Sequence, residues 1–85
     1  MEDNKEGKKV TIIVNTRPHE WEKKEISFVE VVVLAFGSYS DDPKVRYTVD
    51  YSRGPEPHKE GSLVKGQSVK VKEGMVFNAT ETNKS

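Results

Sequence analysis

The side chains that could perform acid–base or metal chemistry are few and scattered in this sequence. The two histidines are His19 and His58. His19 precedes Glu20, but no second histidine follows at helical spacing, so a zinc-binding helix is not indicated. Asp41 and Asp42 could resemble a cation site, yet two adjacent acids before a proline are typical of a turn. We therefore expect no catalytic residue, no metal site and no cofactor.

The sequence also lacks the usual nucleophiles and phosphate-binding motifs. It contains no cysteine, which excludes thiol catalysis, disulfides and a cysteine-type zinc site. No glycine-rich phosphate loop and no nucleophile elbow are present. Ser27 is better explained as a helix cap than as a nucleophile. We expect a protein that is not an enzyme, and the missing cysteines suit a reducing cytoplasm.

The charge balance argues against two classes of partner. Fourteen basic and fourteen acidic residues cancel, which removes the main electrostatic attraction for nucleic acid or an anionic membrane. Lys65, Lys70 and Lys72 form a basic cluster, but Glu60 and Glu73 dilute it, so it is interpreted as a solvated rim. No apolar run approaches the roughly 20 residues of a membrane span. We expect no nucleic-acid partner and no membrane insertion.

The one long apolar run, SFVEVVVLAFG at Ser27–Gly37, must be positioned by the rest of the chain. Its β-branched valines favour a buried strand. Ser27 and Glu30, however, form a capping box, and Gly37 sits where a helix would end. We predict a helix that is apolar on nearly all sides. Either the loop at 38–44 or another protein must then cover its outer side.

The remaining pattern predicts strands before and after this helix. Alternating apolar residues indicate strands at Lys9–Asn15, His19–Lys23, Val45–Tyr51 and Met75–Thr80, with short extended pieces at Leu63–Val64 and Val69–Val71. We interpret residues 1–8 as a disordered tail, 9–80 as the folded domain and 81–85 as a flexible tail.

This order of elements predicts an α+β protein of the β-grasp type. A mixed four- to five-stranded sheet would pack on the single helix. A right-handed crossover would place the last strand parallel to the first at the sheet centre. The residues expected to face the helix are Val10, Ile12, Val14, Trp21, Tyr47, Val49, Met75 and Phe77.

Several segments in this order resemble a known family. They are VTIIVNTRPHEW, ISFVEVVVLAF, YTVDYSRG, EGSLVKGQSVKVKEG and MVFNAT. The set is similar to the bacterial multi-ubiquitin domain family over about residues 9–85. The resemblance implies a ubiquitin-like fold, often in tandem copies. It also implies protein partners: ubiquitin-activating-like and conjugating-like enzymes and a deconjugating peptidase, encoded together in bacterial operons.

Two features depart from that family pattern. The chain holds one copy, and it ends ATETNKS without the glycine pair through which ubiquitin and its sulfur-carrier relatives are activated. A Gly-Gly end is thin and flexible enough to enter an enzyme cleft. If this chain is conjugated, the carboxylate of Ser85, or of an upstream residue after trimming, must serve instead.

The open face of the expected sheet is the candidate interaction surface. In a β-grasp the first, last and third strands are neighbours, and ubiquitin-like domains bind through this face. Ile13 and Val76 would form either a docking patch framed by polar groups or two isolated exposed aliphatic residues. The outward residues are Thr11, Ile13, Arg46, Thr48, Val76 and Asn78.

Three functions remain open from the sequence. The first is a ubiquitin-like modifier conjugated through its C-terminal tail. The second is a non-covalent interaction module or assembly domain, using the sheet face, the apolar helix or a strand edge, including contacts between copies. The third, a small nucleic-acid-binding β domain, is opposed by the balanced charge.

Overall fold

The single predicted helix forms between the two capping residues that the sequence indicates. The computed structural model describes residues 8–83, and helix α1 spans Phe28–Phe36. The Ser27 hydroxyl accepts a hydrogen bond from the Glu30 N–H (3.1 Å), and a Glu30 carboxylate oxygen accepts one from the Ser27 N–H (2.9 Å). Gly37 ends the helix at φ 86°, a left-handed conformation that glycine adopts without strain. Local capping therefore prevails over the strand preference of the valines.

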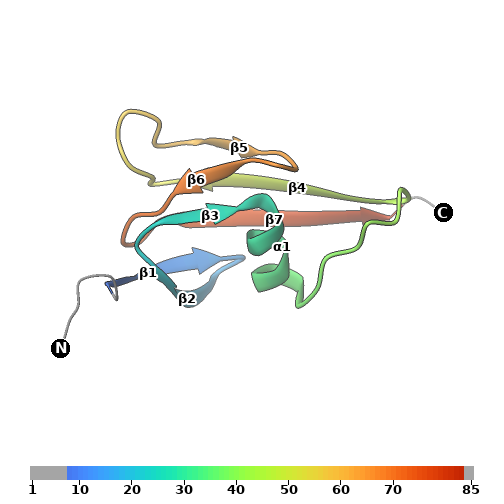
Figure 1. Cartoon of the computed structure of the whole chain (residues 1–85), viewed down its shortest axis with the longest axis horizontal. Helices are drawn as coiled ribbons and strands as arrows, with labels where there is room; N and C mark the ends of the chain where they lie inside the picture. Colours follow the sequence, from blue (N-terminus) through green and yellow to red (C-terminus); the bar gives the residue numbers. More distant parts are fainter. Residues whose placement is uncertain (1–7, 84–85) are drawn as a thin grey trace.

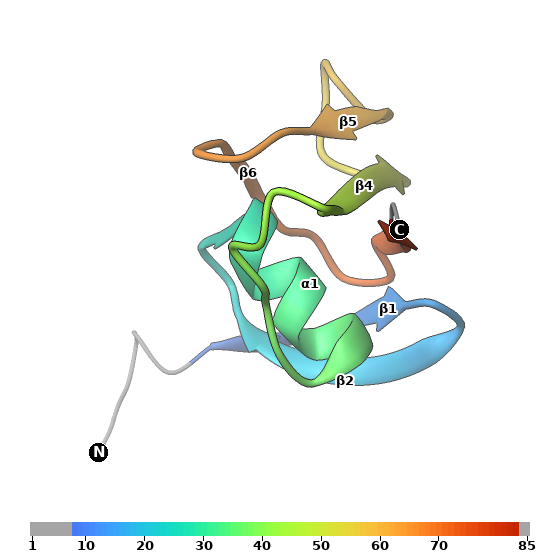
Figure 2. The same cartoon turned by 90° about the vertical axis from the view of Figure 1, so that its right-hand side faces the viewer.

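A curved five-stranded sheet wraps around α1 (Figures 1 and 2). Its strand order is β2-β1-β7-β4-β5, which is the mixed β-grasp arrangement. A second, two-stranded sheet pairs β3 with β6 beside the start of the helix. The strands are β1 Lys9–Val14, β2 Arg17–Glu22, β3 Glu25–Ser27, β4 Val45–Ser52, β5 Gly61–Leu63, β6 Ser68–Lys70 and β7 Val76–Asn83.

The first two strands form a hairpin tighter than the sequence predicts. Asn15 and Thr16 both have positive φ angles, 51° and 70°, as in a two-residue hairpin loop. Pro18 therefore lies inside edge strand β2, opposite Ile13, and not in the turn as expected. An edge strand tolerates proline where the missing N–H would point away from its neighbour.

The parallel pairing of β1 with β7 organises the sheet. Ile13 lies opposite Val76, and Val14 lies opposite Phe77. The Ile13 N–H donates to the Met75 carbonyl (2.9 Å). This pairing confirms that the last strand runs parallel to the first at the sheet centre.

Two strand assignments from the sequence are corrected. Strand β3 was not predicted, because it has three residues and pairs with the remote β6. Strand β7 continues through Asn83, which lies opposite Val45 of β4. Residues 81–83 thus belong to the sheet, and assigning them to a flexible tail is wrong. The predicted disorder of residues 1–7 and the last two residues of the tail lie outside the described residues.

The core lies between the sheet and α1, as the alternation predicts. Trp21 and Tyr47 are half-buried at its margin, where each ring keeps a polar contact: the Trp21 Nε1–H donates to the Glu25 carbonyl, and the Tyr47 hydroxyl accepts from the Ser40 N–H. The other six predicted residues are buried: Val10, Ile12, Val14, Val49, Met75 and Phe77.

The outer side of α1 is covered in part by the chain itself. Tyr39, in the loop after the helix, packs edge-on against Phe28 (ring centroids 6.4 Å apart) and stacks on Tyr47 (5.2 Å). Val33 and Phe36 remain 41% and 39% exposed. The loop therefore covers one side of the helix, and two apolar side chains stay accessible. No helix within residues 8–83 is both long and apolar enough to cross a membrane.

Candidate functional site: the open face of the sheet

The open face is built by the strand alternation that also builds the core. In β1, Ile12 and Val14 are buried, so Thr11 and Ile13 point to the opposite face. In β7, Phe77 and Ala79 are buried, which places Val76 and Asn78 on the same face as Thr11 and Ile13, with Val76 opposite Ile13. In β4, Arg46 and Thr48 are exposed on the same side. The structure thus places all six predicted residues on one face.

The strand register divides these six residues into two groups. Val76 lies opposite Ser52 of β4, whereas Arg46 lies opposite Thr82, six residues further along the ladder. At 3.3 Å per residue, Arg46 is therefore about 20 Å from the Ile13–Val76 pair. Thr48 lies opposite Thr80, between the two. The six residues therefore share one face but not one patch, because alternation fixes the face of a residue and not its position along the sheet.

The apolar part of the face is a short strip across three strands. Ile13 and Val76, both half-buried, are direct neighbours, and Pro18 lies opposite Ile13 on β2. We name Pro18, Ile13 and Val76 the apolar strip. Pro18 was not predicted to lie on this face, because only the two-residue turn places it in the strand.

Polar groups border the strip on both sides. Thr11 is held by the adjacent turn: its N–H donates to a Glu73 carboxylate oxygen (2.9 Å), and its carbonyl accepts from the Gly74 N–H (2.7 Å). Across β7, Asp50 lies opposite Asn78 and accepts a hydrogen bond from the Ser62 hydroxyl (2.9 Å). A small apolar centre with a hydrogen-bonding rim is the usual composition of a protein-docking surface.

The residues with possible metal or acid–base chemistry do not converge. His19 lies on β2, and His58 lies exposed in the loop that follows β4. Asp42 builds a turn, since its carboxylate accepts the Lys44 N–H (2.9 Å). No three histidine or acidic side chains within residues 8–83 are grouped to hold a metal ion.

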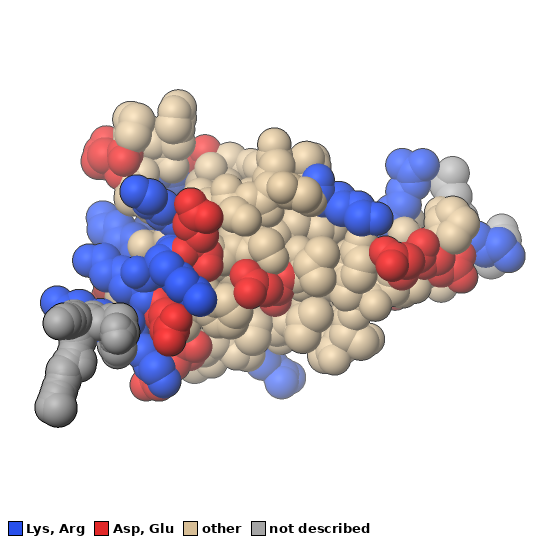
Figure 3. Space-filling view, in the orientation of Figure 1, with Lys and Arg blue, Asp and Glu red and all other residues tan. Residues whose placement is uncertain are grey.

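The basic cluster is dispersed among acids. Lys59 pairs with Glu56 (2.9 Å), and Lys65 pairs with Asp41 (3.5 Å); all four side chains are largely exposed. On the face shown in Figure 3, charges of both signs gather at the two ends of the molecule, most of them at the end where β1 begins, and the centre carries few. Mixed signs create no strong field for a polyanion.

Comparison with known proteins identifies the family. Neither the curated proteins nor the solved structures contain a match to the chain. The family model described as "Multiubiquitin" matches residues 10–83, which begin in β1 and end with β7. The match thus covers nearly the whole chain and all but the first residue of the sheet. With its five-stranded mixed sheet folded around one helix, the chain belongs to the multiubiquitin family and is a ubiquitin-like domain.

Proposed function

We propose that this domain is a protein modifier, activated and conjugated by partner enzymes through its C-terminal carboxylate. The residue that carries the carboxylate is Ser85, or an upstream residue after trimming; Ser85 itself lies outside the described residues. The observation that carries the proposal is membership of the multiubiquitin family. The partners would be an activating-like enzyme, a conjugating-like enzyme and a deconjugating peptidase, in the cytoplasm.

The position of β7 supports such a role. The strand ends at the opposite end of the sheet from the beginning of β1 (Figure 1), and its last four residues, 80–83, are exposed. An enzyme could therefore reach the carboxyl end without contacting the core. The chemistry would be the usual one: the carboxylate attacks the α-phosphate of ATP and releases pyrophosphate. A thiol of the enzyme then displaces AMP to give a thioester.

The pairing of β7 with β4 sets a condition on that chemistry. Thr82 lies opposite Arg46, and Asn83 lies opposite Val45. An enzyme cleft that holds the chain extended before the reacting carboxylate must either begin after Asn83 or separate the end of β7 from β4. Separation breaks cross-strand hydrogen bonds, each contributing about 1 kcal/mol. Separating the two strands costs little more than these hydrogen bonds, because the β7 side chains in this part of the sheet are already exposed.

Incubation with ATP and a ubiquitin-activating-like enzyme from the same genome tests this function. We expect an enzyme adduct whose mass equals the sum of the two proteins minus one water, and whose link is cleaved by added thiol. The matched control is the same chain ending in a C-terminal amide, which has no carboxylate to activate. Absence of an adduct from the protein with its native end contradicts the proposal.

A second function is favoured by the apolar strip: non-covalent recognition through the open face. Replacing Ile13 with aspartate places a charge at the centre of the strip. We expect binding to the activating-like enzyme, measured calorimetrically without ATP, to weaken at least about tenfold, which is about 1.4 kcal/mol. The control is Val33→Asp, which adds the same charge at an exposed position of α1. Equal binding by both variants and the parent protein would exclude the open face as the docking surface.

A further inference from the structure

A second surface, separate from the open face, lies along the free edge of β4. In β7, the odd-numbered residues direct their backbone N–H and C=O groups towards β1, so the even-numbered residues direct theirs towards β4. The even-numbered residues of β7 lie opposite the even-numbered residues of β4 and bond to them. The odd-numbered residues of β4 therefore direct their backbone groups away from β7. On that side β5 pairs only with Val49–Tyr51. On this side, away from β7, Tyr47 (two residues earlier) has no strand opposite it among residues 8–83. Its N–H and C=O form an open hydrogen-bonding edge.

The edge is open because the chain turns away after β5. The Gln67 N–H donates to the Val64 carbonyl (3.0 Å), and the Gln67 side chain accepts from the Val64 N–H (3.1 Å). Gly66, at φ 91°, completes this turn. The chain then crosses to form β6 against β3. The place that a longer β5 would occupy opposite Tyr47 is left to another strand.

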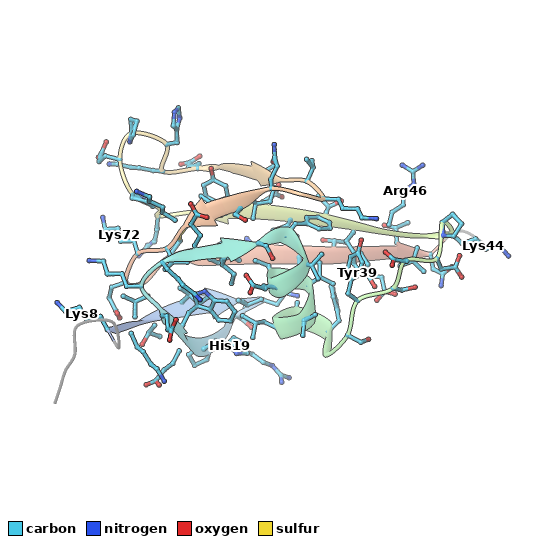
Figure 4. The ribbon with its side chains drawn as sticks, in the orientation of Figure 1. Lys8, His19, Tyr39, Lys44, Arg46 and Lys72 are labelled. Atoms are coloured by element: carbon cyan, nitrogen blue, oxygen red, sulfur yellow. The ribbon has the colours of Figure 1, made fainter. Side chains whose placement is uncertain are left out.

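A groove of about 360 Å³ lies against this open edge. Its lining includes Phe28 of α1, Tyr39 of the following loop, Tyr47 of β4 and Val64. Figure 4 shows Tyr39 between the helix and β4, close to the part of β4 that carries Arg46. Val64 is 57% exposed, the most exposed large apolar side chain within the described residues. The volume is sufficient for one large apolar side chain.

A weak ion pair joins two of the residues that line the groove. Lys65 Nζ lies 3.5 Å from Asp41 Oδ1, and the two residues come from the two loops that border the groove. Both side chains are at least 70% exposed. Such exposed pairs contribute little to stability, so this pair separates at small cost.

We propose that the groove binds an extended segment of a partner protein, which adds to β4 as a strand opposite Tyr47. In an antiparallel pair, the residue directly opposite would exchange two main-chain hydrogen bonds with Tyr47. Its side chain would point to the same side of the sheet as the Tyr47 ring. The groove lies on the side of the sheet that carries the Tyr47 ring. The segment therefore carries a large apolar residue at this position, and strand addition supplies the main-chain contacts.

A second copy of this chain does not fit the groove as well. Of its other edge strands, β2 and β5 offer no free apolar side chain with a main-chain N–H, since the exposed Pro18 of β2 has none. If its β4 edge paired here without meeting β5, Arg46 would lie opposite Arg46, and like charges directly opposite are unfavourable. Leu63 of β5 is buried in its own core, and Trp21 of β2 packs against it. At the end of β7, the residues on the corresponding side are Glu81 and Asn83, which are polar. The occupant is therefore a segment of another protein.

The experiment uses a phage-displayed library of random peptides selected against the full chain, followed by synthesis of the selected peptides. We expect the selected sequences to share one large apolar residue within a strand-forming segment. Saturating peptide should slow hydrogen exchange of the Tyr47 N–H about tenfold or more. The Arg46 and Thr48 amides, which already face β7, are the internal controls and should not change.

Two substitutions distinguish binding in the groove from non-specific binding of the peptide elsewhere on the surface. Val64→Glu should weaken peptide binding at least about tenfold, without unfolding the chain, because Val64 is exposed. Val33→Glu, at a similarly exposed apolar site outside the groove, should leave binding unchanged. Failure to select any peptide, equal binding to Val64→Glu, or an unchanged Tyr47 amide would overturn the proposal. Protection of Tyr47 that rises with protein concentration alone would assign the groove to a second copy.

Discussion

Replacing Phe77 with alanine is expected to lower the free energy of unfolding by about 3–5 kcal/mol. Phe77 is fully buried and is the largest of the fully buried side chains. It lies on the central strand β7, opposite Val14 of β1 and Tyr51 of β4, and its ring centroid is 6.2 Å from that of Tyr51. Truncation leaves a cavity that three strands and the helix cannot close without moving together.

The loss is large for a domain of this size. Small domains have a total stability of about 5–15 kcal/mol, and 85 residues bury a limited core. Urea unfolding followed by Trp21 fluorescence measures the change. Val64→Ala is the control, because truncating the exposed Val64 side chain should lower the free energy of unfolding by less than about 0.5 kcal/mol. A similar loss in both variants would show that Phe77 does not fill the core.

Replacing Asn15 with alanine is expected to cost about 2–4 kcal/mol, because two separate contributions are lost. The Asn15 side chain continues the sheet where β1 ends: its Nδ2–H donates to the Ala79 carbonyl (3.1 Å), and its Oδ1 accepts from the Ala79 N–H (2.8 Å). Its backbone also lies at φ 51°. Asparagine tolerates this left-handed conformation better than alanine does.

Two further substitutions at this position separate the contributions. Asn15→Gly removes the side-chain hydrogen bonds but adopts the positive φ freely, so it should lose less stability than alanine. Asn15→Asp keeps the acceptor for the Ala79 N–H and loses the donor to the Ala79 carbonyl. Its stability should therefore also lie between that of the parent protein and that of Asn15→Ala. Thermal unfolding followed by circular dichroism measures the series. If Asn15→Gly is as stable as the parent protein, the hydrogen bonds to Ala79 contribute nothing.

The helix could be predicted from the sequence because its signals are local. Ser27, Glu30 and Gly37 lie within eleven residues, and each acts through a hydrogen bond or a backbone angle of its own segment. The inward faces of β1 and β4 were predictable for the same reason, since alternation is a property of the strand alone.

The strand ends were not predictable, because pairing with remote strands determines them. Glu81, Thr82 and Asn83 include no apolar residue, so no alternation marks them as part of a strand. They are held in the sheet by pairing with β4. Strand β3 is likewise formed by its pairing with β6. A pattern that concerns one segment carries no information about its partner.

The candidate sites show the same division. Alternation placed Ile13, Val76 and Arg46 on one face, but only the register shows that Arg46 lies far from the other two. The groove beside Tyr47 depends on where β5 stops and on two loops that meet there. None of these features has a signature in the residues that line it.

The central claim is that β1 and β7 lie side by side and run in the same direction, because this pairing joins the core, the apolar strip and the exit of the carboxyl end. Nuclear Overhauser contacts between the two strands test it most directly. We expect contacts of Thr11 with Gly74, of Ile13 with Val76 and of Asn15 with Ala79, rising together along both strands. Contacts that rise along one strand while falling along the other, or none between these segments, would contradict the account.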